Sequence, residues 1–129
     1  MIIPDTVTSI KDYAFYDCES LVSVIIGNSV ETIGYQAFYG CESLVSVTFP
    51  DSVKFIDSYA FNGTSIESLI IPDTVTSIGT WAFNHCTSLV SVTIGNSVET
   101  IGRGTFNSCT SLESVTIPNS VTSIGNNAF

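Results

Sequence analysis

The sequence predicts a repeat solenoid, a fold in which short units of similar sequence stack into one elongated coil. A valine recurs at intervals of 23, 23, 22, 23 and 23 residues, at Val7, Val30, Val53, Val75, Val98 and Val121. An isoleucine follows each valine by three residues, and a phenylalanine follows that isoleucine by five. Little of the 129-residue chain lies outside this pattern. We therefore expect one solenoid over residues 1–129, with about five and a half repeats of about 23 residues.

The last part of each unit is predicted to be a strand. In residues 44–49, Val47 and Phe49 alternate with Ser46 and Thr48. Alternation of this kind places apolar side chains on one face of a strand and hydroxyls on the other. Pro50 ends the stretch, because proline lacks the N–H that a ladder needs. Stacking of the units should align these strands as one parallel sheet, with about 4.8 Å between neighbours.

The rest of each unit should contain a second short extended piece and a turn. The Val-x-x-Ile motif points two apolar side chains inward. The Ala-Phe-x-x-Cys-x-x-Leu motif has apolar residues at steps of three, which suits one turn of α- or 3₁₀-helix. We therefore expect short helical turns or short strands on the sides of the coil away from the main sheet. A single unit buries too few apolar side chains to fold alone, so contacts between units should supply the stability.

Four cysteines occupy one repeat position, at Cys18, Cys41, Cys86 and Cys109. We expect them to stack in a row inside the coil. Their side chains should point in parallel, which is poor geometry for a disulfide, and the short C-x-x-C spacing typical of zinc sites is missing. The row is therefore predicted to consist of small buried residues with free thiols.

The unit Leu-x-x-Val-x-Ile-Pro-x-x-Val-x-x-Ile-Gly-x-x-Ala-Phe-x-x-Cys resembles the Treponema-type, or BspA-like, leucine-rich repeat, and the resemblance extends over residues 2–129. It implies a curved right-handed coil with the Leu-x-x-Val-x-Ile strands on the concave side. It also implies a surface or secreted protein that adheres to host proteins or to other cells, and hence an extracellular or cell-surface location. This functional part is an analogy, since a fold does not fix a function.

The chain departs from the usual repeat in two respects. The asparagine that ends the strand motif in most leucine-rich repeats is a serine or threonine here, as at Ser52 and Thr74, so a ladder of hydroxyls is expected. No capping unit, signal peptide or transmembrane stretch is recognisable. We therefore expect a segment of a longer array, natural or engineered, whose uncapped ends allow end-to-end self-association.

A ligand-binding surface is predicted on the concave sheet, because solenoids use such extended faces for recognition. The strand period places two rows of side chains there, with two acids beside the later units: Ser23, Ile25, Ser46, Thr48, Ser68, Ile70, Ser91, Thr93, Ser114, Thr116, Glu67 and Glu113. The alternative is that these residues are present only for their β-propensity. A second candidate surface is an aromatic patch on the convex side, because tyrosine and tryptophan are enriched in binding hot spots. This patch consists of Tyr13, Tyr35, Tyr59 and Trp81.

The charge of the chain restricts its partners. The net charge is −9, from twelve acids against Lys11, Lys54 and Arg103. This balance argues against nucleic acid, because phosphate binding needs a basic surface. It also argues against anionic membrane surfaces, and we expect no membrane insertion. A cationic patch on a protein is a better partner, although the charge can also serve solubility alone.

No residue is predicted to be catalytic, and no cofactor or metal is expected. His85 stands beside Cys86, but neighbours in sequence point to different faces and no third group orients them. Asp5, Asp51 and Asp73 share one repeat position with asparagines. Single carboxylates alternating with amides supply fewer oxygens than calcium needs, so turn chemistry is the preferred interpretation.

The main hypothesis is a non-enzymatic solenoid that binds a host or cell-surface protein through its concave sheet. The first alternative is a structural spacer within a longer repeat array or an engineered repeat protein. A remote alternative is ice-surface binding, because Ser-x-Thr ladders make flat hydroxyl arrays. Uneven rows, in which Ile25 and Ile70 stand among threonines, argue against ice binding.

Overall fold

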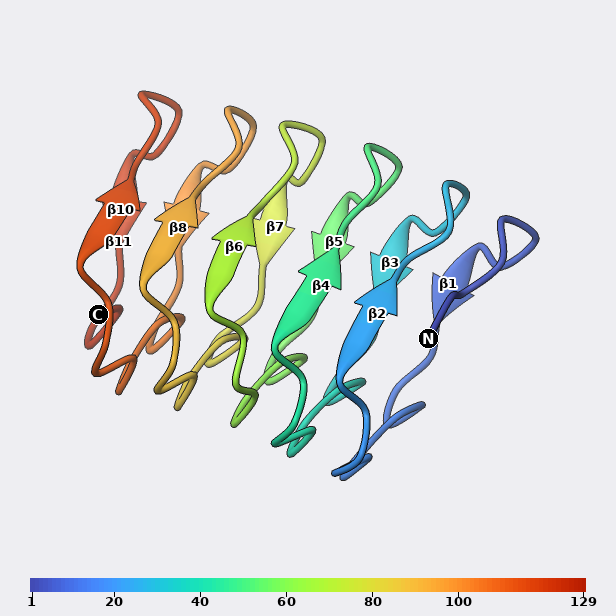
Figure 1. The fold of residues 1–129 in the computed structure, drawn as a ribbon. Helices are drawn as coiled ribbons and strands as arrows, with labels where there is room; N and C mark the ends of the chain where they lie inside the picture. The colour runs from blue at the N-terminus through green and yellow to red at the C-terminus, as the bar shows by residue number, and fades with distance from the viewer.

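The computed structural model describes residues 1–129 as one coil of about five turns, each turn displaced from the last by one repeat unit (Figure 1). The three-residue strands lie on one face, which we call the front sheet. They are β2 (Ser23–Ile25), β4 (Ser46–Thr48), β6 (Ser68–Ile70), β8 (Ser91–Thr93) and β10 (Ser114–Thr116). Each lies in the alternating stretch of its unit, so the predicted main strands are confirmed.

A second set of strands, each two residues long, lies behind the front sheet (Figure 1). They are β1 (Ser9–Ile10), β3 (Thr32–Ile33), β5 (Phe55–Ile56), β7 (Ser77–Ile78), β9 (Thr100–Ile101) and β11 (Ser123–Ile124). Every one ends on the isoleucine of the Val-x-x-Ile motif. The short strands expected away from the main sheet are therefore present.

Paired strands run parallel to their counterparts in the next coil. Val24 lies opposite Val47, and Leu69 lies opposite Val92. Val24, Leu69 and Val92 are buried, whereas Ser46 faces solvent. This arrangement is the half-buried strand that the alternation predicts, and it stacks each paired side chain on the residue at the same repeat position one unit away.

Helical turns, the other structure expected outside the main sheet, are not found. Residues 11–20 form successive hydrogen-bonded turns. The Phe15 N–H donates to the Ala37 carbonyl of the next coil at 2.8 Å, while the Ala14 N–H donates to the Lys11 carbonyl at 3.2 Å within the turn. Donors thus alternate between the two directions, whereas a helix keeps its bonds within the segment. The fold accordingly has no apolar helix of the length needed to cross a membrane.

Left-handed backbone conformations explain why these segments are not helical. In the first coil, φ is 59° at Tyr13 and 52° at Asp17, and in the fourth it is 60° at Trp81 and 56° at His85. A right-handed helix requires negative φ throughout, and positive φ costs a residue with a side chain about 1–2 kcal/mol. Bonds to the neighbouring coils hold these residues in place. Neither the types of these residues nor their spacing in the sequence indicates a left-handed conformation, so the sequence could not predict it.

Phenylalanine rings form a continuous stack through the centre of the coil. Ring centres of successive units are 5.0–5.6 Å apart, with interplanar angles of 3–12°. The stack consists of Phe15, Phe38, Phe61, Phe83, Phe106 and Phe129. The four middle rings are essentially inaccessible to solvent, and the repeated valines and isoleucines pack in the same core.

The predicted hydroxyl ladder is present in three units. Ser52 Oγ donates to the Val30 carbonyl at 2.7 Å, and Ser120 Oγ donates to the Val98 carbonyl at 2.8 Å. Thr74 makes the equivalent bond at 2.9 Å. In each case the acceptor belongs to the preceding coil. A short hydroxyl side chain therefore takes the linking role that we expected at this position.

Replacing Phe61 by alanine should lower the free energy of unfolding by about 3–5 kcal/mol, because it removes a fully buried ring and leaves a cavity in the stack. Urea denaturation followed by circular dichroism measures this change. Phe55 on β5 is 48% exposed, so Phe55→Ala is the matched control and should cost less than about 1 kcal/mol. Equal losses in the two variants would contradict the stack as a main source of stability.

Candidate functional site

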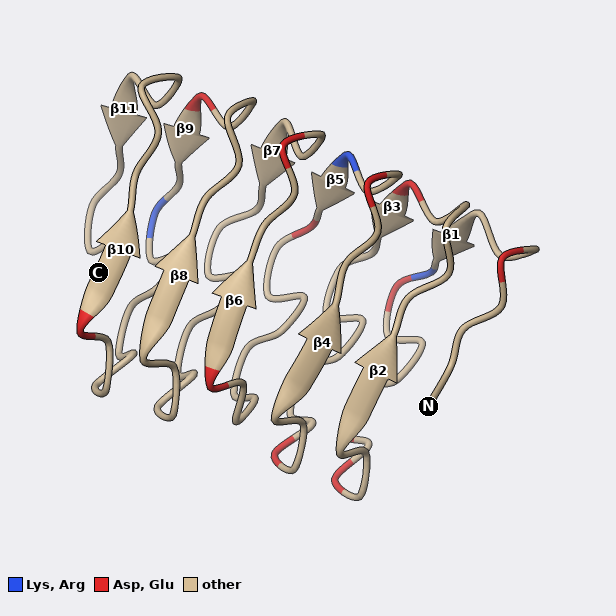
Figure 2. Ribbon diagram, turned by 45° about the horizontal axis from the view of Figure 1, so that its top comes forward, with Lys and Arg blue, Asp and Glu red and all other residues tan.

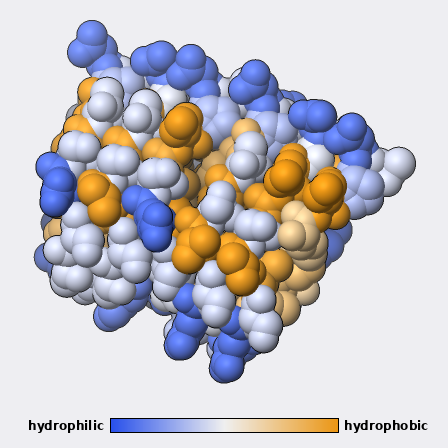
Figure 3. Space-filling view, in the orientation of Figure 1, coloured by the Kyte–Doolittle hydropathy of each residue, from blue (hydrophilic) through white to orange (hydrophobic).

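The residues predicted to face a ligand all lie on the outer side of the front sheet. Ile25 and Ile70 are 51% and 73% exposed, and the serines and threonines of the two rows are exposed except for Ser91, which is half-buried. Figure 3 shows this face as a mixture of pale hydroxyl-bearing side chains and orange apolar ones. The structure thus brings the predicted residues together on one surface.

One edge of this face carries both apolar and acidic side chains, and both of its acids lie beside the later coils. Val22 and Val45, beside the first two front strands, are 56% and 38% exposed. Glu67 and Glu113 take the equivalent position before β6 and β10, where Figure 2 colours the ribbon red at the start of each strand, and Val90 takes it before β8, 42% exposed. A partner lying across the front sheet therefore meets negative charge on the later coils.

The front sheet is interrupted, which the sequence analysis did not predict. β2 pairs with β4, and β6 pairs with β8 and β10, but β4 and β6 do not pair. One bond still joins their amino ends, from the Glu67 N–H to the Val45 carbonyl at 3.3 Å. We call the unpaired junction between β4 and β6, on the carboxyl side of this bond, the seam. The back strands divide elsewhere, between β7 and β9, so the two interruptions do not coincide.

The seam lies beside the single 22-residue spacing of the sequence. In the preceding unit the Leu44 N–H donates to the Cys41 carbonyl at 2.9 Å, which closes the turn that leads into β4. No such bond closes the turn before β6, where Ser65 Oγ instead donates to the Glu42 carbonyl at 2.6 Å. The chain thus reaches β6 with one residue fewer, and we attribute the seam to this shorter turn.

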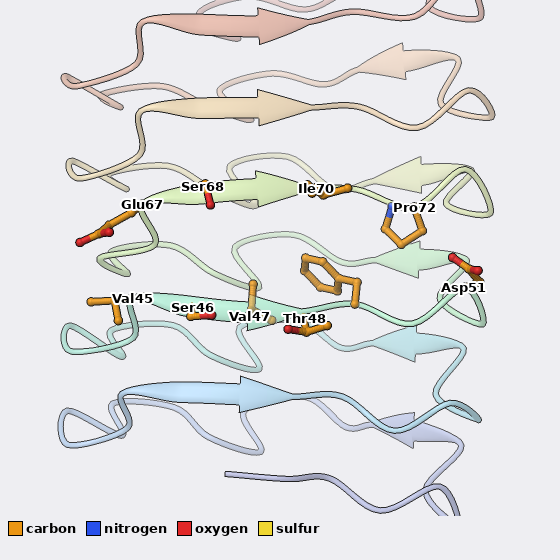
Figure 4. Close-up of a pocket in the computed structure, with 10 residues that line it drawn as sticks. Val45, Ser46, Val47, Thr48, Asp51, Glu67, Ser68, Ile70 and Pro72 are labelled. Carbon is orange, nitrogen blue, oxygen red and sulfur yellow. The ribbon is translucent and has the colours of Figure 1, made fainter.

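A groove of about 560 Å³ follows the seam (Figure 4). Its floor is formed by Val47 and Phe49, which are only half-buried, whereas the equivalent Leu69 and Ile71 of the next coil are buried. The Phe49 ring meets the Phe61 ring edge-on, with their centres 5.5 Å apart. Separation of the two strands therefore opens part of the apolar core to the surface.

Polar groups surround the apolar floor of the groove. Ser46 and Ser68 project from the two facing strands, and Ile70 lies further along β6 (Figure 4). Glu67 stands at one end of the groove and Asp51 at the other. Sequence reasoning named five of the lining residues, Ser46, Thr48, Glu67, Ser68 and Ile70, but it assigned Asp51 to turn chemistry and missed the floor. The one signal that could have found the floor is the missing residue in the third unit.

The aspartate row serves turn chemistry, but across coils rather than within one turn. Asp5 Oδ1 accepts the Asn28 N–H of the next coil at 2.7 Å, and Asp73 Oδ1 accepts the Asn96 N–H at 2.8 Å. Asp51 has the same position in its unit yet accepts no equivalent bond. Its carboxylate therefore remains available at the end of the groove.

The predicted aromatic patch is brought together only in its first three members. Tyr35 meets Tyr13 and Tyr59 edge-on, with ring centres 5.5 and 6.0 Å away. Burial against these rings raises the pKa of the Tyr35 phenol. Trp81 instead lies against the Arg103 guanidinium, 5.7 Å from its ring centre, which is cation–π geometry. The patch is thus a tyrosine cluster followed by an indole that already holds a cation.

The cysteines form the predicted row of free thiols. Cys41 Sγ donates to the Phe15 carbonyl of the preceding coil at 3.1 Å, and Cys109 Sγ donates to the Phe83 carbonyl at 3.2 Å. Burial raises the pKa of the Cys41 thiol to about 11. A hydrogen bond with Cys109, together with burial, raises the pKa of Cys86. The same hydrogen bond lowers the pKa of Cys109. Cys41 and Cys86 therefore act as small structural groups rather than nucleophiles.

No assembled centre for acid–base or metal chemistry is present. His85 is exposed, while the adjacent Cys86 is buried and bonds to the Phe61 carbonyl at 3.3 Å. The two side chains thus point to different sides of the turn. No three side chains from histidine, cysteine, aspartate or glutamate lie close enough together to hold a metal ion.

Parallel strands that recur at each 23-residue unit and stack into one coil define a leucine-rich-repeat solenoid. The family model described as the BspA type leucine rich repeat region matches residues 8–129 in six copies, and the chain belongs to that family. No curated protein sequence matches the chain.

Solved structures agree with this assignment. The leucine-rich repeat protein TpLRR of T. pallidum is 28% identical, with a TM-score of 0.71, and the match covers 97% of this chain and 72% of that protein. A leucine-rich repeat protein of Bacteroides ovatus is 31% identical, with a TM-score of 0.73, over 96% of this chain and 38% of that one. The pneumococcal vaccine antigen PcpA shares the fold at 21% identity and a TM-score of 0.75, over all of this chain and 33% of PcpA. The chain therefore spans little more than a third of two of these proteins.

The Cys41 and Cys86 thiols should resist labelling by Ellman's reagent at pH 8, because their raised pKa values suppress thiolate formation inside the coil. Cys18, which is only partly buried, should react rapidly, and Cys109, which is buried but has a lowered pKa, should react more slowly. In Cys18→Ser the rapid phase should disappear. Because the folded pKa of Cys41 is raised from 9.0 to about 11, its contribution to stability is complete below pH 9 and declines as the pH rises through 11. Rapid labelling of three or four thiols in the folded protein would contradict this account.

Proposed function

We propose that the chain is a non-enzymatic, protein-binding and adhesive segment of a surface or secreted protein, and that it binds through the front face. The observation that carries this proposal is the open outer side of the front sheet, which no other element covers and which contains the groove (Figure 4). Solenoids commonly bind partners on such extended sheets. Paired strands hold the sheet together on either side of the seam.

Family and charge suggest the kind of partner. The resemblance to BspA-type repeats favours adhesion to a host or cell-surface protein and an extracellular location. The chain carries twelve acids and three bases, and the acids Glu67 and Glu113 flank the proposed surface. A partner with a basic patch is therefore the best electrostatic match.

The structure is compatible with the spacer role but disfavours ice binding. A spacer role needs only the stacking of coils, and it predicts no partner for the front face. Ice binding needs a flat array of evenly spaced hydroxyls. Ile25 and Ile70 interrupt the hydroxyl rows, and the seam disturbs the spacing between β4 and β6, so the geometry disfavours ice binding.

The proposal predicts that a partner captured from a panel of extracellular-matrix and cell-surface proteins will be lost on modification of the front face. Ser46→Arg with Thr93→Arg adds bulk and positive charge at two exposed positions of this face. Affinity measured by surface plasmon resonance should fall at least about tenfold, because the changes obstruct the contact and oppose a basic partner.

Ser20→Arg with Thr110→Arg is the matched control, since it makes the same two changes at exposed positions of the turns. This control should bind as the unmodified chain does. A partner that tolerates the front-face variant but is lost in Tyr13→Ala with Tyr35→Ala would move the binding site to the tyrosine cluster. Failure to capture any protein would favour the spacer role.

A further inference from the structure

Backbone groups at the seam lack the partners that their counterparts have at the other junctions of the front sheet. The N–H groups of Ile26, Ile71 and Ile94 donate to the next coil at 3.1, 2.9 and 3.1 Å. Phe49 holds the same repeat position, but its N–H makes no bond to the Ile70 carbonyl across the seam. A donor and an acceptor are therefore left unpaired at the carboxyl end of the groove.

The charges around the groove have one sign. Its lining includes Asp51 and Glu67 but no lysine or arginine. Asp51 lacks the N–H partner that Asp5 and Asp73 have. Lys54 forms an ion pair with Glu31 at 3.1 Å rather than with either acid of the groove. The groove therefore offers two uncompensated carboxylates, which complement a cationic occupant.

The spacing of the two acids restricts the shape of that occupant. Glu67 lies level with Val45, to which its N–H is bonded, and Asp51 comes six residues after Val45. An extended chain rises about 3.3 Å per residue, so basic side chains about six residues apart reach both ends. Residues separated by an even number point to the same side of such a chain. Apolar side chains between the two bases can thus face Val47 and Phe49 on the floor.

We propose that the groove at the seam binds an extended segment of a protein partner that carries two basic side chains about six residues apart, with apolar side chains between them on the same side. The bases pair with Asp51 and Glu67, and the apolar side chains cover the exposed floor. The unpaired Phe49 N–H and Ile70 carbonyl are available to the backbone of the segment. This inference rests on the proposed function, because it assigns a binding chemistry to part of the same face.

The probe is a fluorescein-labelled, amidated peptide, Lys-Ser-Val-Ser-Val-Ser-Lys, titrated with the full chain in low salt and followed by fluorescence anisotropy. Asp51→Asn with Glu67→Gln should weaken its binding about tenfold, because two partly exposed charge pairs are lost. Both residues are exposed, and Asp51 accepts no bond from a neighbouring coil, so the variant should keep the circular dichroism of the unmodified chain. Glu19→Gln with Glu99→Gln removes the same charge from exposed positions outside the groove and away from the front strands, and this variant should bind normally.

A second peptide, Ser-Lys-Val-Lys-Val-Ser-Ser, has the same composition but directs its lysines away from its valines. It should bind clearly more weakly than the first. Three outcomes would each overturn the inference. They are equal affinity for the two peptides, equal affinity of the unmodified chain and of Asp51→Asn with Glu67→Gln for the first peptide, and no binding of the first peptide at about millimolar concentration. The proposed function is tested separately by the front-face variant. A protein lost in that variant but retained in Asp51→Asn with Glu67→Gln would overturn the groove assignment alone.

Discussion

Hydrogen bonds between equivalent residues of neighbouring coils are the constraint on which the rest of the structure depends. They join the front strands, the back strands and the turns alike, and they hold each backbone segment about 4.8 Å from its counterpart. At this distance a side chain rests on the one at the same repeat position in the next unit, so each repeat position becomes a row. The stack of phenylalanine rings, 5.0–5.6 Å apart, is the largest of these rows. The stability of a coil therefore depends on its neighbours.

The same constraint determines how polar groups are satisfied. The Cys109 thiol, the Ser52 hydroxyl and the Asp73 carboxylate all find their partners in an adjacent coil. Each of these bonds needs that coil at the regular distance. Where β4 and β6 separate, the Phe49 N–H and the Asp51 carboxylate lose such partners. A local change of spacing thus turns groups that serve the scaffold into groups that a ligand can use.

Most of the fold could be predicted from the sequence because the repeat determines the register. The strands, the inward residues, the free thiols and the exposed front rows all follow from one period. The turns could not be predicted, because residues such as Tyr13 and Trp81 adopt positive φ where they are hydrogen-bonded to a neighbouring coil. The groove also escaped prediction. The short third unit was visible in the sequence, but the effect of one missing residue on strand pairing depends on contacts in three dimensions.

The seam also bears on how such proteins diversify. The front strands on both sides of the seam keep their pairing, and the ring stack crosses the irregular unit without a gap, with Phe61 5.0 Å from Phe38 and 5.3 Å from Phe83. In a compact globular core, a one-residue deletion disturbs packing in every direction. Here the disturbance is confined to one junction of an array whose contacts reach only to the next unit. Near-identical units can therefore acquire individual surface features through single-codon losses, while the copies around them preserve the framework.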